Sequence, residues 1–387
     1  MAFELSPALP PSLRGRLRCD LDFDLAAAPE LEPGVLRNNR LYRLAASDGR
    51  RLLLKVYLRD GRRRLEREWA ALAFLRRRGF ASVPEAHLCS VDDYYGVYSF
   101  ESGANKTAAE WTIEDARAAG SFAAELHSIS PDDPDASGAE FPPAFSATFS
   151  YADQIAGIRR RLAVFDDYLA STDVGTTGPL PESVRSLLAE INAVAEVERL
   201  IAAAVIGLAP ADIEARIPPL DHRLNTCDFS PHNILIRPPG HPGGHLCVVD
   251  HEYFGWDEPG GLIAGFLTAD QALDLSLAAS TAFLDSYISA ASEEIVSATL
   301  TRLARVSALM HASWSAIHLQ LLTPKLIEKK RFGSPTLDVS VHVNEQIAKL
   351  RRRLALACDQ VVTLRSSRSA ASRSVSPASG AHGAGWP

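Results

Sequence analysis

Three polar residues of this chain stand in the order and spacing of a phosphoryl-transfer site. Asn233 follows Asp228 by five positions, and Asp250 comes after a second apolar run. In such a site the first Asp accepts the proton of the attacking hydroxyl, while the Asn and the second Asp hold the magnesium that bridges the nucleotide phosphates. Each residue alone could serve in a turn or at a strand end. The ordered set instead predicts a catalytic Asp228 and a metal site at Asn233 and Asp250.

The segment between the two predicted metal ligands has the pattern of a β-hairpin. Residues 234–237 and 245–249 are short apolar runs typical of strands, and residues 238–244 begin with Pro-Pro-Gly, a loop signal. A metal bound to two phosphate oxygens takes hard oxygen ligands from neighbouring chain segments. The hairpin predicts such a site, because it places Asn233 and Asp250 together at its open end.

A further carboxylate, Glu252, stands two residues after Asp250. Side chains at this separation point to the same side of an extended chain. Glu252 could therefore add a second carboxylate to the metal site. The alternative is an acid in a solvated loop.

Two strings in this region carry a family resemblance, namely DFSPHN from Asp228 and DHEYFGWDEP from Asp250. They resemble the aminoglycoside phosphotransferase and choline kinase superfamily, whose members share the fold of protein kinases. The Asp-x-Glu-Tyr pattern is similar to choline and ethanolamine kinases, and the fuller strings also resemble a bacterial branch of uncharacterised phosphotransferases. The resemblance implies ATP and Mg²⁺ as cofactors.

The fold class implied by the resemblance is α+β, a protein-kinase-like two-lobed fold with a small antiparallel-sheet N-lobe and a larger, mainly helical C-lobe. We expect residues 1–100 to form the N-lobe and residues 101–365 the C-lobe, which contains the hinge, the catalytic hairpin and a helical substrate region. Residues 366–387 are rich in Ser, Ala, Gly and Pro and predict a disordered tail.

The resemblance also implies a lysine on an N-lobe strand, paired with a glutamate on the next helix so that the lysine contacts the nucleotide phosphates. Residues 51–57 form a short apolar run that contains Lys55, and residues 64–78 have apolar positions at helical spacing. The family pattern around the glutamate selects Glu68 over Glu66. The alternative for Lys55 is a lysine at a strand edge, and for Glu66 an exposed acid paired with nearby arginines.

A nucleotide-covering loop is implied before the lysine strand, where residues 33–44 stand. Gly34 is the one glycine there at which the backbone could closely approach phosphates. By resemblance, Asn39 is carried over as a nucleotide contact. Residues 95–103 would form the hinge between the lobes and offer backbone groups to adenine.

Composition agrees with a two-lobed enzyme of the cytoplasm. The chain has 387 residues, 47% of them hydrophobic, and lacks an apolar segment long enough to span a membrane. A net charge of −7 argues against nucleic acid as a partner. The five cysteines are scattered and predict reduced thiols. A local basic cluster is expected to be a solvated loop and helix face, and it consists of Arg59, Arg62, Arg63, Arg64 and Arg67.

Two helical regions, about 151–208 and 270–357, should select the substrate. Their charged side chains favour substrates of opposite charge. Residues 165–168, Phe-Asp-Asp-Tyr, could bind a cationic alcohol or simply form a helix surface. Basic side chains near residue 330 could instead meet an acidic substrate or close a helix end. They are Lys325, Lys329, Lys330 and Arg331.

The predicted reaction is Mg-dependent transfer of the ATP γ-phosphoryl group to a hydroxyl of a small molecule: a sugar, an amino alcohol or an aminoglycoside-like compound. Three features depart from the family pattern: Thr226 where many relatives have His, Leu262 where many have Asp, and a sparse glycine loop. They leave open a nucleotide-binding pseudokinase with a regulatory or scaffolding role. The sequence does not indicate an oligomeric state.

Overall fold

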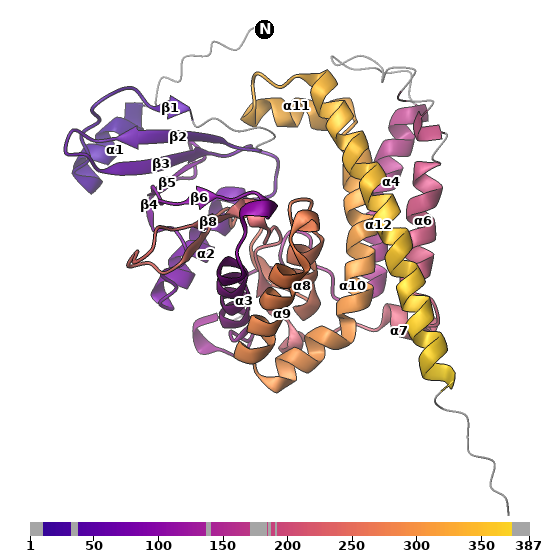
Figure 1. Ribbon diagram of the computed structural model, residues 1–387. Coiled ribbons are helices and arrows are strands. Elements are labelled where there is room, and N and C mark those ends of the chain that lie inside the picture. The colour runs from indigo at the N-terminus through magenta and orange to yellow at the C-terminus, as the bar shows by residue number, and fades with distance from the viewer. Residues whose placement is uncertain are drawn as a thin grey trace, which may run out of the picture.

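The computed structural model describes residues 11–31, 38–136, 141–170, 184, 187–189 and 192–373, with the side chains of residue 11 and residues 357–373 left aside. An antiparallel sheet at the N-terminal side sits above a mainly helical remainder (Figure 1). This confirms the predicted α+β, protein-kinase-like fold. Gly34 of the predicted nucleotide-covering loop lies outside the described residues.

The N-terminal sheet has five strands in the order β1-β2-β3-β5-β4, and every neighbouring pair is antiparallel. Apolar side chains on one face of the sheet pack against helix α1 (Pro11–Leu21), among them Leu54 and Val97. Helix α2 (Arg64–Arg77) follows the third strand and carries its own apolar side into a separate core. The strands are β1 Glu30–Leu31, β2 Arg40–Ala45, β3 Arg51–Val56, β4 Ala86–Ser90 and β5 Tyr95–Ser99.

The predicted hairpin is confirmed. Strand β8 (Ile234–Ile236) pairs antiparallel with β9 (Leu246–Val248), and Ile234 lies opposite Val248. The backbone N–H of Arg237 donates to the carbonyl of His245 at 2.9 Å, which extends the pairing toward the loop. Strand β6 joins this sheet, and β7 pairs with β10; their bounds are β6 Ala104–Asn105, β7 Arg223–Asn225 and β10 Gly255–Asp257.

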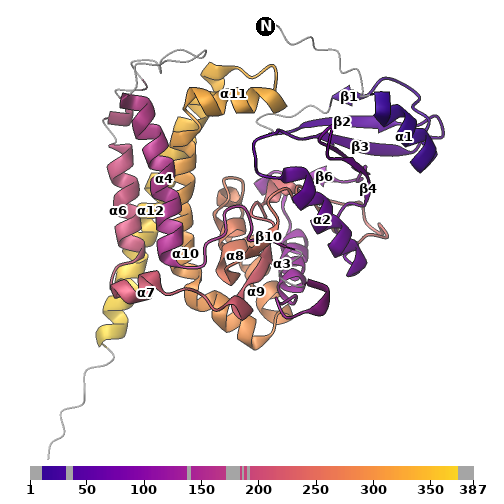
Figure 2. The ribbon, with the colours of Figure 1, turned by 180° about the vertical axis from the view of Figure 1, so that it is seen from behind.

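The helical part contains two cores that meet at the long helix α10. The first core lies between α2, α3, α8 and α9 and includes Phe229 and Phe283. The second lies between α4, α6, α10 and α12, which stand together as a separate column (Figure 2). The helices are α3 Ile113–His127, α4 Tyr151–Ala170, α6 Ala193–Ala204, α7 Pro210–Glu214, α8 Pro259–Thr268, α9 Leu277–Ala290, α10 Glu293–Gln320, α11 Pro324–Gly333 and α12 Val339–Arg373.

Helix α11 leaves this column and reaches toward the N-terminal sheet (Figures 1 and 2). The guanidinium of Arg40 on β2 donates to the carbonyl of Phe332 at 2.9 Å and lies over its ring. Lys329 of the same helix stands 3.8 Å from Asp60 in the loop before α2. The short helix α11 therefore connects the column of α4, α6, α10 and α12 to the N-terminal lobe.

Helix α12 runs to Arg373 and so passes the predicted start of the tail at residue 366. Ala and Arg are good helix formers, and they interrupt the serines there. Residues 374–387 lie outside the described residues, so the predicted disorder stays a prediction. Within the described chain, no helix is both long and apolar enough to cross a membrane.

Close packing of α3 on α9 depends on Gly120. A Cβ at this position would overlap the carbonyl oxygen of Phe283 and approach Cβ of Ser286 to 3.0 Å. We expect Gly120→Ala to lower the free energy of unfolding by about 1–3 kcal/mol, because the helices must separate. Gly15→Ala is the matched control, since nothing lies near a Cβ there, and it should raise stability by about 0.5–1 kcal/mol. Urea unfolding measures both, and equal effects of the two substitutions would contradict this packing.

Two buried histidines predict acid sensitivity. Burial lowers the pKa of His127 to about 3 and that of His311 to about 4. As pH falls below about 6.5, the unfolded chain takes up protons on these residues while the folded chain does not. The free energy of unfolding should therefore fall by up to about 1.4 kcal/mol per pH unit for each histidine. In denaturant titrations between pH 6 and pH 4.5, His127→Gln should make the free energy of unfolding fall less steeply with decreasing pH. An unchanged pH dependence would contradict the role of His127.

Candidate active site

Lys55 lies at the centre of the site. Its position on β3 points the side chain away from the solvent, and only 7% of it is exposed. The ammonium contacts Glu68 at 2.7 Å and Asp250 at 2.6 Å. Burial works against the charge, but the two carboxylates outweigh it and raise the pKa of Lys55 well above its ordinary value. Lys55 is therefore a permanently charged lysine that joins β3 to α2 and to the end of β9.

Glu68, and not Glu66, is the partner of Lys55. Burial raises the pKa of Glu68, although Lys55 opposes the shift. Its carboxylate also accepts a hydrogen bond from the hydroxyl of Tyr57 at 2.6 Å. Glu66, two residues earlier on the same helix, is partly exposed and lies 3.6 Å from Arg63. The geometry thus agrees with the choice of Glu68 and with the alternative reading of Glu66.

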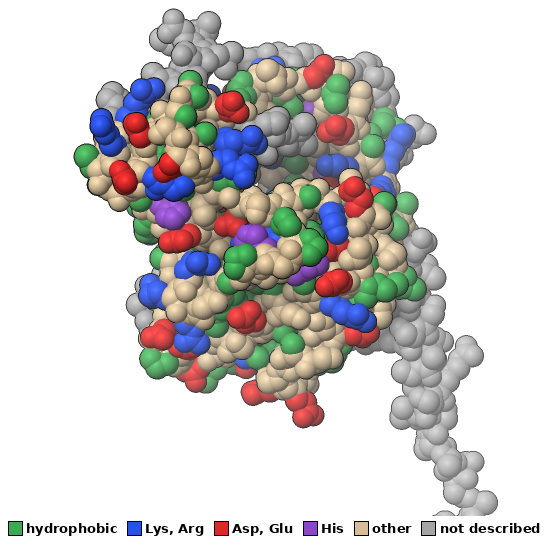
Figure 3. Space-filling view, turned by 60° about the vertical axis from the view of Figure 1, so that its left-hand side comes forward, with side chains coloured by type: hydrophobic (Ala, Val, Ile, Leu, Met, Phe, Trp, Pro, Cys, Tyr) green, Lys and Arg blue, Asp and Glu red, His purple; other side chains and the backbone are tan. Residues whose placement is uncertain are grey.

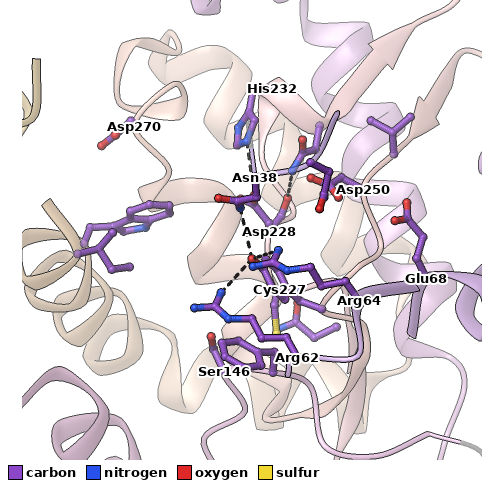
Figure 4. A pocket seen from close by; sticks show the side chains of 18 of the residues that line it. Asn38, Arg62, Arg64, Glu68, Ser146, Cys227, Asp228, His232, Asp250 and Asp270 are labelled. Atoms are coloured by element: carbon purple, nitrogen blue, oxygen red, sulfur yellow. Dashed lines mark hydrogen bonds and ion pairs between the residues drawn. The ribbon is translucent and has the colours of Figure 1, made fainter. Parts of the chain in front are cut away.

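The catalytic loop places Asp228 and Asn233 side by side. A single 3₁₀ turn, Pro231–Asn233, brings the chain back so that the side-chain amide of Asn233 donates to the carbonyl of Asp228 at 2.9 Å. The Asp228 carboxylate is 26% exposed and lies 3.5 Å from the ring of His232. Burial opposes a charge on His232, but Asp228 raises its pKa above the usual value. A carboxylate is thus open to the cavity while its backbone is fixed (Figure 4).

The hairpin brings Asp250 to the same place. The N–H of Val249 donates to the carbonyl of Asn233 at 2.9 Å, so the residue after β9 lies beside the catalytic loop. Asp250 has a left-handed backbone, with φ of 66°, which turns the chain sharply at the strand end. Burial raises the pKa of its carboxyl, but Lys55 lowers it further, so the net pKa is below its ordinary value.

Glu252 is completely buried, so the alternative of a solvated loop acid is wrong. Its carboxylate pairs with the guanidinium of Arg64, accepts a hydrogen bond from the amide of Asn39, and lies 3.7 Å from Lys55. Burial raises the pKa of Glu252 to about 7. Both ends of the Asn39 amide are engaged, because its oxygen accepts from the N–H of Leu58 at 3.1 Å. The nucleotide contact predicted for Asn39 stays a prediction.

The prediction of a solvated face is wrong for Arg64. Its side chain is 2% exposed and pairs with Asp60 at 2.8 Å as well as with Glu252. It also donates to the hydroxyl of Tyr253 at 2.6 Å. A signal was present in the spacing, because Arg64 stands four residues before Glu68 and so shares its face of α2.

Oxygen ligands of the kind that Mg²⁺ prefers gather here. Carboxylate oxygens of Glu68, Asp250 and Glu252 all lie within 4.8 Å of one another. Asn233 uses its amide N–H on Asp228, so its carbonyl oxygen is the atom that a metal would take. The side chain of Asp250 is 34% exposed, whereas those of Glu68 and Glu252 are 5% and 0% exposed. Asp250, together with the nearby Asn233, therefore fits a metal best among these residues.

The site opens into a cavity of about 1230 Å³ between the lobes. Lys55, Asp228 and Asp250 line one side of it, and Asp228 and Asp250 are seen close together in Figure 4. Residues of α4, α10, α11 and α12 also line it, from the helical column that stands across from the N-terminal sheet (Figure 1). The segment 165–168 is a helix surface: Phe165 lies in the second core, and its neighbours Asp166 and Asp167 are exposed.

Two of the departures from the family pattern, Thr226 and Leu262, are buried. Thr226 is 1% exposed, and its hydroxyl has no hydrogen-bond partner among the described residues. Leu262 packs in the first core. Asn225 holds the catalytic loop in a different way, by accepting from the N–H of Cys227 at 2.7 Å and donating to Asp257 at 2.9 Å.

Comparison with known families and structures defines the class. The model of the phosphotransferase enzyme family matches residues 34–261, more than half of the chain, so the chain belongs to this family. This confirms the prediction of an ATP-dependent phosphotransferase with an alcohol group as acceptor. Comparison with curated proteins gives no match.

Solved structures with the same fold include a spectinomycin phosphotransferase in complex with ADP and spectinomycin, at 10% identity and a TM-score of 0.60, covering 89% of this chain and 99% of that one. An ethanolamine kinase from Plasmodium vivax has 15% identity and a TM-score of 0.55, with coverage of 87% and 85%. A choline/ethanolamine kinase family protein from Mesorhizobium loti has 17% identity and a TM-score of 0.51, with coverage of 89% and 98%.

The pairing of Lys55 with Glu68 predicts a specific effect on nucleotide binding. Glu68→Gln should raise the Kd for MgADP about tenfold or more, because the buried lysine loses its charged anchor and no longer meets the phosphates. Glu66→Gln is the matched control on the same helix and should leave the Kd within about twofold. Isothermal titration calorimetry compares them; similar Kd values for the two variants would argue against the assignment of Glu68.

Proposed function

We propose that this protein transfers the γ-phosphoryl group of ATP to a hydroxyl of a small molecule in a Mg²⁺-dependent reaction. The main support is a single cavity lined by Lys55, Asp228 and Asp250, which come from three separate segments of the chain. The family and the kinase fold of its relatives support this reaction. Relatives named for spectinomycin and ethanolamine support a sugar, an amino alcohol or an aminoglycoside-like compound as acceptor.

In this proposal Asp228 orients the acceptor hydroxyl and takes its proton as the oxygen attacks the γ-phosphorus. The bond between the γ-phosphorus and the β–γ bridging oxygen breaks, and ADP leaves. Lys55 leaves Asp250 and contacts the nucleotide phosphates, while Glu68 keeps the ammonium in position. Asn233 and Asp250 would hold Mg²⁺, which would offset the negative charge of the phosphates, and Glu252 acts through Arg64 and Lys55. The site is thus arranged for positioning and electrostatic stabilisation.

The lobe boundaries belong to the same proposal. The N-terminal sheet ends at Ser99, next to the expected division at residues 100 and 101. Residues 1–100 would cover the nucleotide, and residues 101–365 would bind the acceptor. We propose the cytoplasm as the location, since it supplies ATP.

The second candidate is a pseudokinase that binds nucleotide without turnover. The observation that favours it is the buried Thr226 hydroxyl, which has no hydrogen-bond partner in the described part of the chain, at a position where a brace for the catalytic loop is expected. The amide of Asn225, the residue before Thr226, argues against the pseudokinase, because its hydrogen bonds to Cys227 and Asp257 supply such a brace.

A turnover screen tests the proposal. Pools of sugars, amino alcohols, nucleosides and aminoglycosides are incubated with MgATP, and ADP release is measured. We expect turnover with one pool, and Asp228→Asn should lower kcat by about a hundredfold to ten-thousandfold, because the general base is lost. Turnover that survives unchanged in the variant would contradict the role of Asp228.

Asp250→Asn separates the kinase from the alternatives. In the wild type, MgADP should stabilise the protein more than ADP alone, by about 2.7 kcal/mol at a ligand concentration one hundred times the Kd. In the variant, MgADP should stabilise the protein no more than ADP alone does, because the proposed metal ligand at position 250 has lost its negative charge. Stabilisation by MgADP without turnover on any pool would favour the pseudokinase, and no stabilisation at all would exclude both readings.

A further inference from the structure

The far end of the cavity is a wall of helix faces. On α4 the residues that line it recur at helical spacing, Gln154, Gly157 and Arg161, while Ile155 and Ile158 point into the second core. Helix α11, which reaches toward the N-terminal lobe (Figures 1 and 2), contributes Lys329 and Lys330 to this wall. The acceptor substrate would lie between this wall and Asp228.

Basic side chains dominate this wall. Arg160 and Arg161 come from α4, and their neighbour Arg159 is turned outward, where it pairs with Glu198 on α6 at 2.9 Å. Blue Lys and Arg side chains border the hollow between the lobes in a surface view (Figure 3). The cations that line the far end of the cavity are Arg160, Arg161, Lys329, Lys330 and Lys349.

Carboxylates of the same cavity already have cationic partners. Asp270 pairs with Arg353 at 2.9 Å and lies 3.5 Å from Lys349. Glu258 pairs with Arg302 at 2.8 Å. A cationic alcohol would have to displace one of these partners, so this wall does not favour a choline-like head group.

Further carboxylates at the rim are engaged in the same way. Asp60 holds Arg64 at 2.8 Å, and Asp153 lies 3.3 Å from Arg216. Asp228 and Asp250 remain for the hydroxyl and the metal in the proposed function. Asp257 also lines the cavity, but it is buried and its oxygens accept hydrogen bonds from N–H groups of Thr148, Asn225 and Glu258. These carboxylates therefore already have partners within the protein before any substrate enters.

Arg160 and Arg161 are different, because no carboxylate of the described chain lies within salt-bridge distance of either. Arg161 donates only to the carbonyl of Gly157, in its own helix, at 3.2 Å. Burial, together with the guanidiniums of Arg160 and Arg62, lowers the pKa of Arg161 to about 10. It stays charged near neutral pH, and an anion would relieve this unfavourable burial of charge.

Lys330 extends the basic wall toward the reacting groups. Burial lowers its pKa to about 8, although Asp228 and Glu252 act against the shift. Lys330, Arg161 and Asp228 line the same cavity. An anion bound by these cations could therefore belong to a molecule whose hydroxyl meets Asp228.

We propose that the acceptor substrate carries an anionic group, a phosphate or a carboxylate, which Arg161 binds together with Arg160 and Lys330 while the substrate hydroxyl meets Asp228. The planar guanidinium suits either group, because it donates two parallel hydrogen bonds. This inference rests on the proposed function and specifies its substrate class. It chooses the acidic alternative from the two substrate charges that the sequence left open.

Matched acceptors test this inference by kinetics. The pairs are ribose and ribose 5-phosphate, glucose and gluconate, and ethanolamine and serine, with ADP release as the readout. The anionic member of at least one pair should have a kcat/KM about tenfold or more above its partner. Preference for the phosphate or for the carboxylate distinguishes the two groups. Transfer only to neutral or cationic acceptors would overturn the inference and leave the proposed function intact.

Arginine variants test whether Arg161 binds the anionic group of the acceptor. Arg161→Ala should raise the KM for the anionic acceptor about tenfold or more and leave the KM for ATP within about twofold; Arg161→Lys should restore part of the loss. Arg159→Ala, on the opposite side of the helix, is the control and should change neither constant. A rise in the KM for ATP alone would assign Arg161 to the nucleotide and overturn the inference.

A binding measurement separates failure of the inference from failure of the proposed function. With the nucleotide site filled by Mg²⁺ and a non-hydrolysable ATP analogue, inorganic phosphate should raise the Tm of the wild type more than chloride at equal ionic strength. Arg161→Ala should lose this difference, and Arg159→Ala should keep it. An equal response of wild type and Arg161→Ala would overturn the inference whether or not turnover is found.

Discussion

The buried ammonium of Lys55 is the interaction on which the rest of the site depends. A charge with only 7% of its side chain exposed is stable only when it is paired. Its two close partners, Glu68 and Asp250, come from a helix of the N-terminal lobe and from the end of the catalytic hairpin. The pairing therefore fixes the distance between the lobes at the point where phosphates would bind. Glu252 and Arg64 form a second buried pair behind it.

The same constraint explains the shape of the cavity. The lobes meet at Lys55 on one side, and on the other side α11 reaches across to the N-terminal lobe through Arg40 and Asp60. Between these two connections lies the space lined by α4, α10 and α12. Since the carboxylates there have partners of their own, the positive charge of the substrate end comes from arginines such as Arg161, which has no carboxylate partner among the described residues.

The sequence predicted the parts of the site that depend on local spacing. Asp228, Asn233 and Asp250 are tied together by one loop and one hairpin, and Lys55 and Glu68 by one strand and the next helix, so short-range pattern was sufficient. It did not predict the burial of Arg64 or its pairing with Glu252, because those residues are far apart in the chain and an arginine-rich helix start looks solvated. Of the basic wall of the cavity, the sequence indicated Lys329 and Lys330 but not Arg161, since only the packing of α4 on the second core decides which arginine of 159–161 faces inward.

A crystal structure with Mg²⁺ and a non-hydrolysable ATP analogue tests the central claim most directly. The account predicts that Lys55 keeps Glu68 and moves from Asp250 to the phosphates, while the metal binds the oxygens of Asn233 and Asp250. It also predicts that Arg64 stays on Glu252. A metal held by Glu68, Asp250 and Glu252 without Asn233, or a Lys55 that remains on Asp250 with the nucleotide bound, would contradict it.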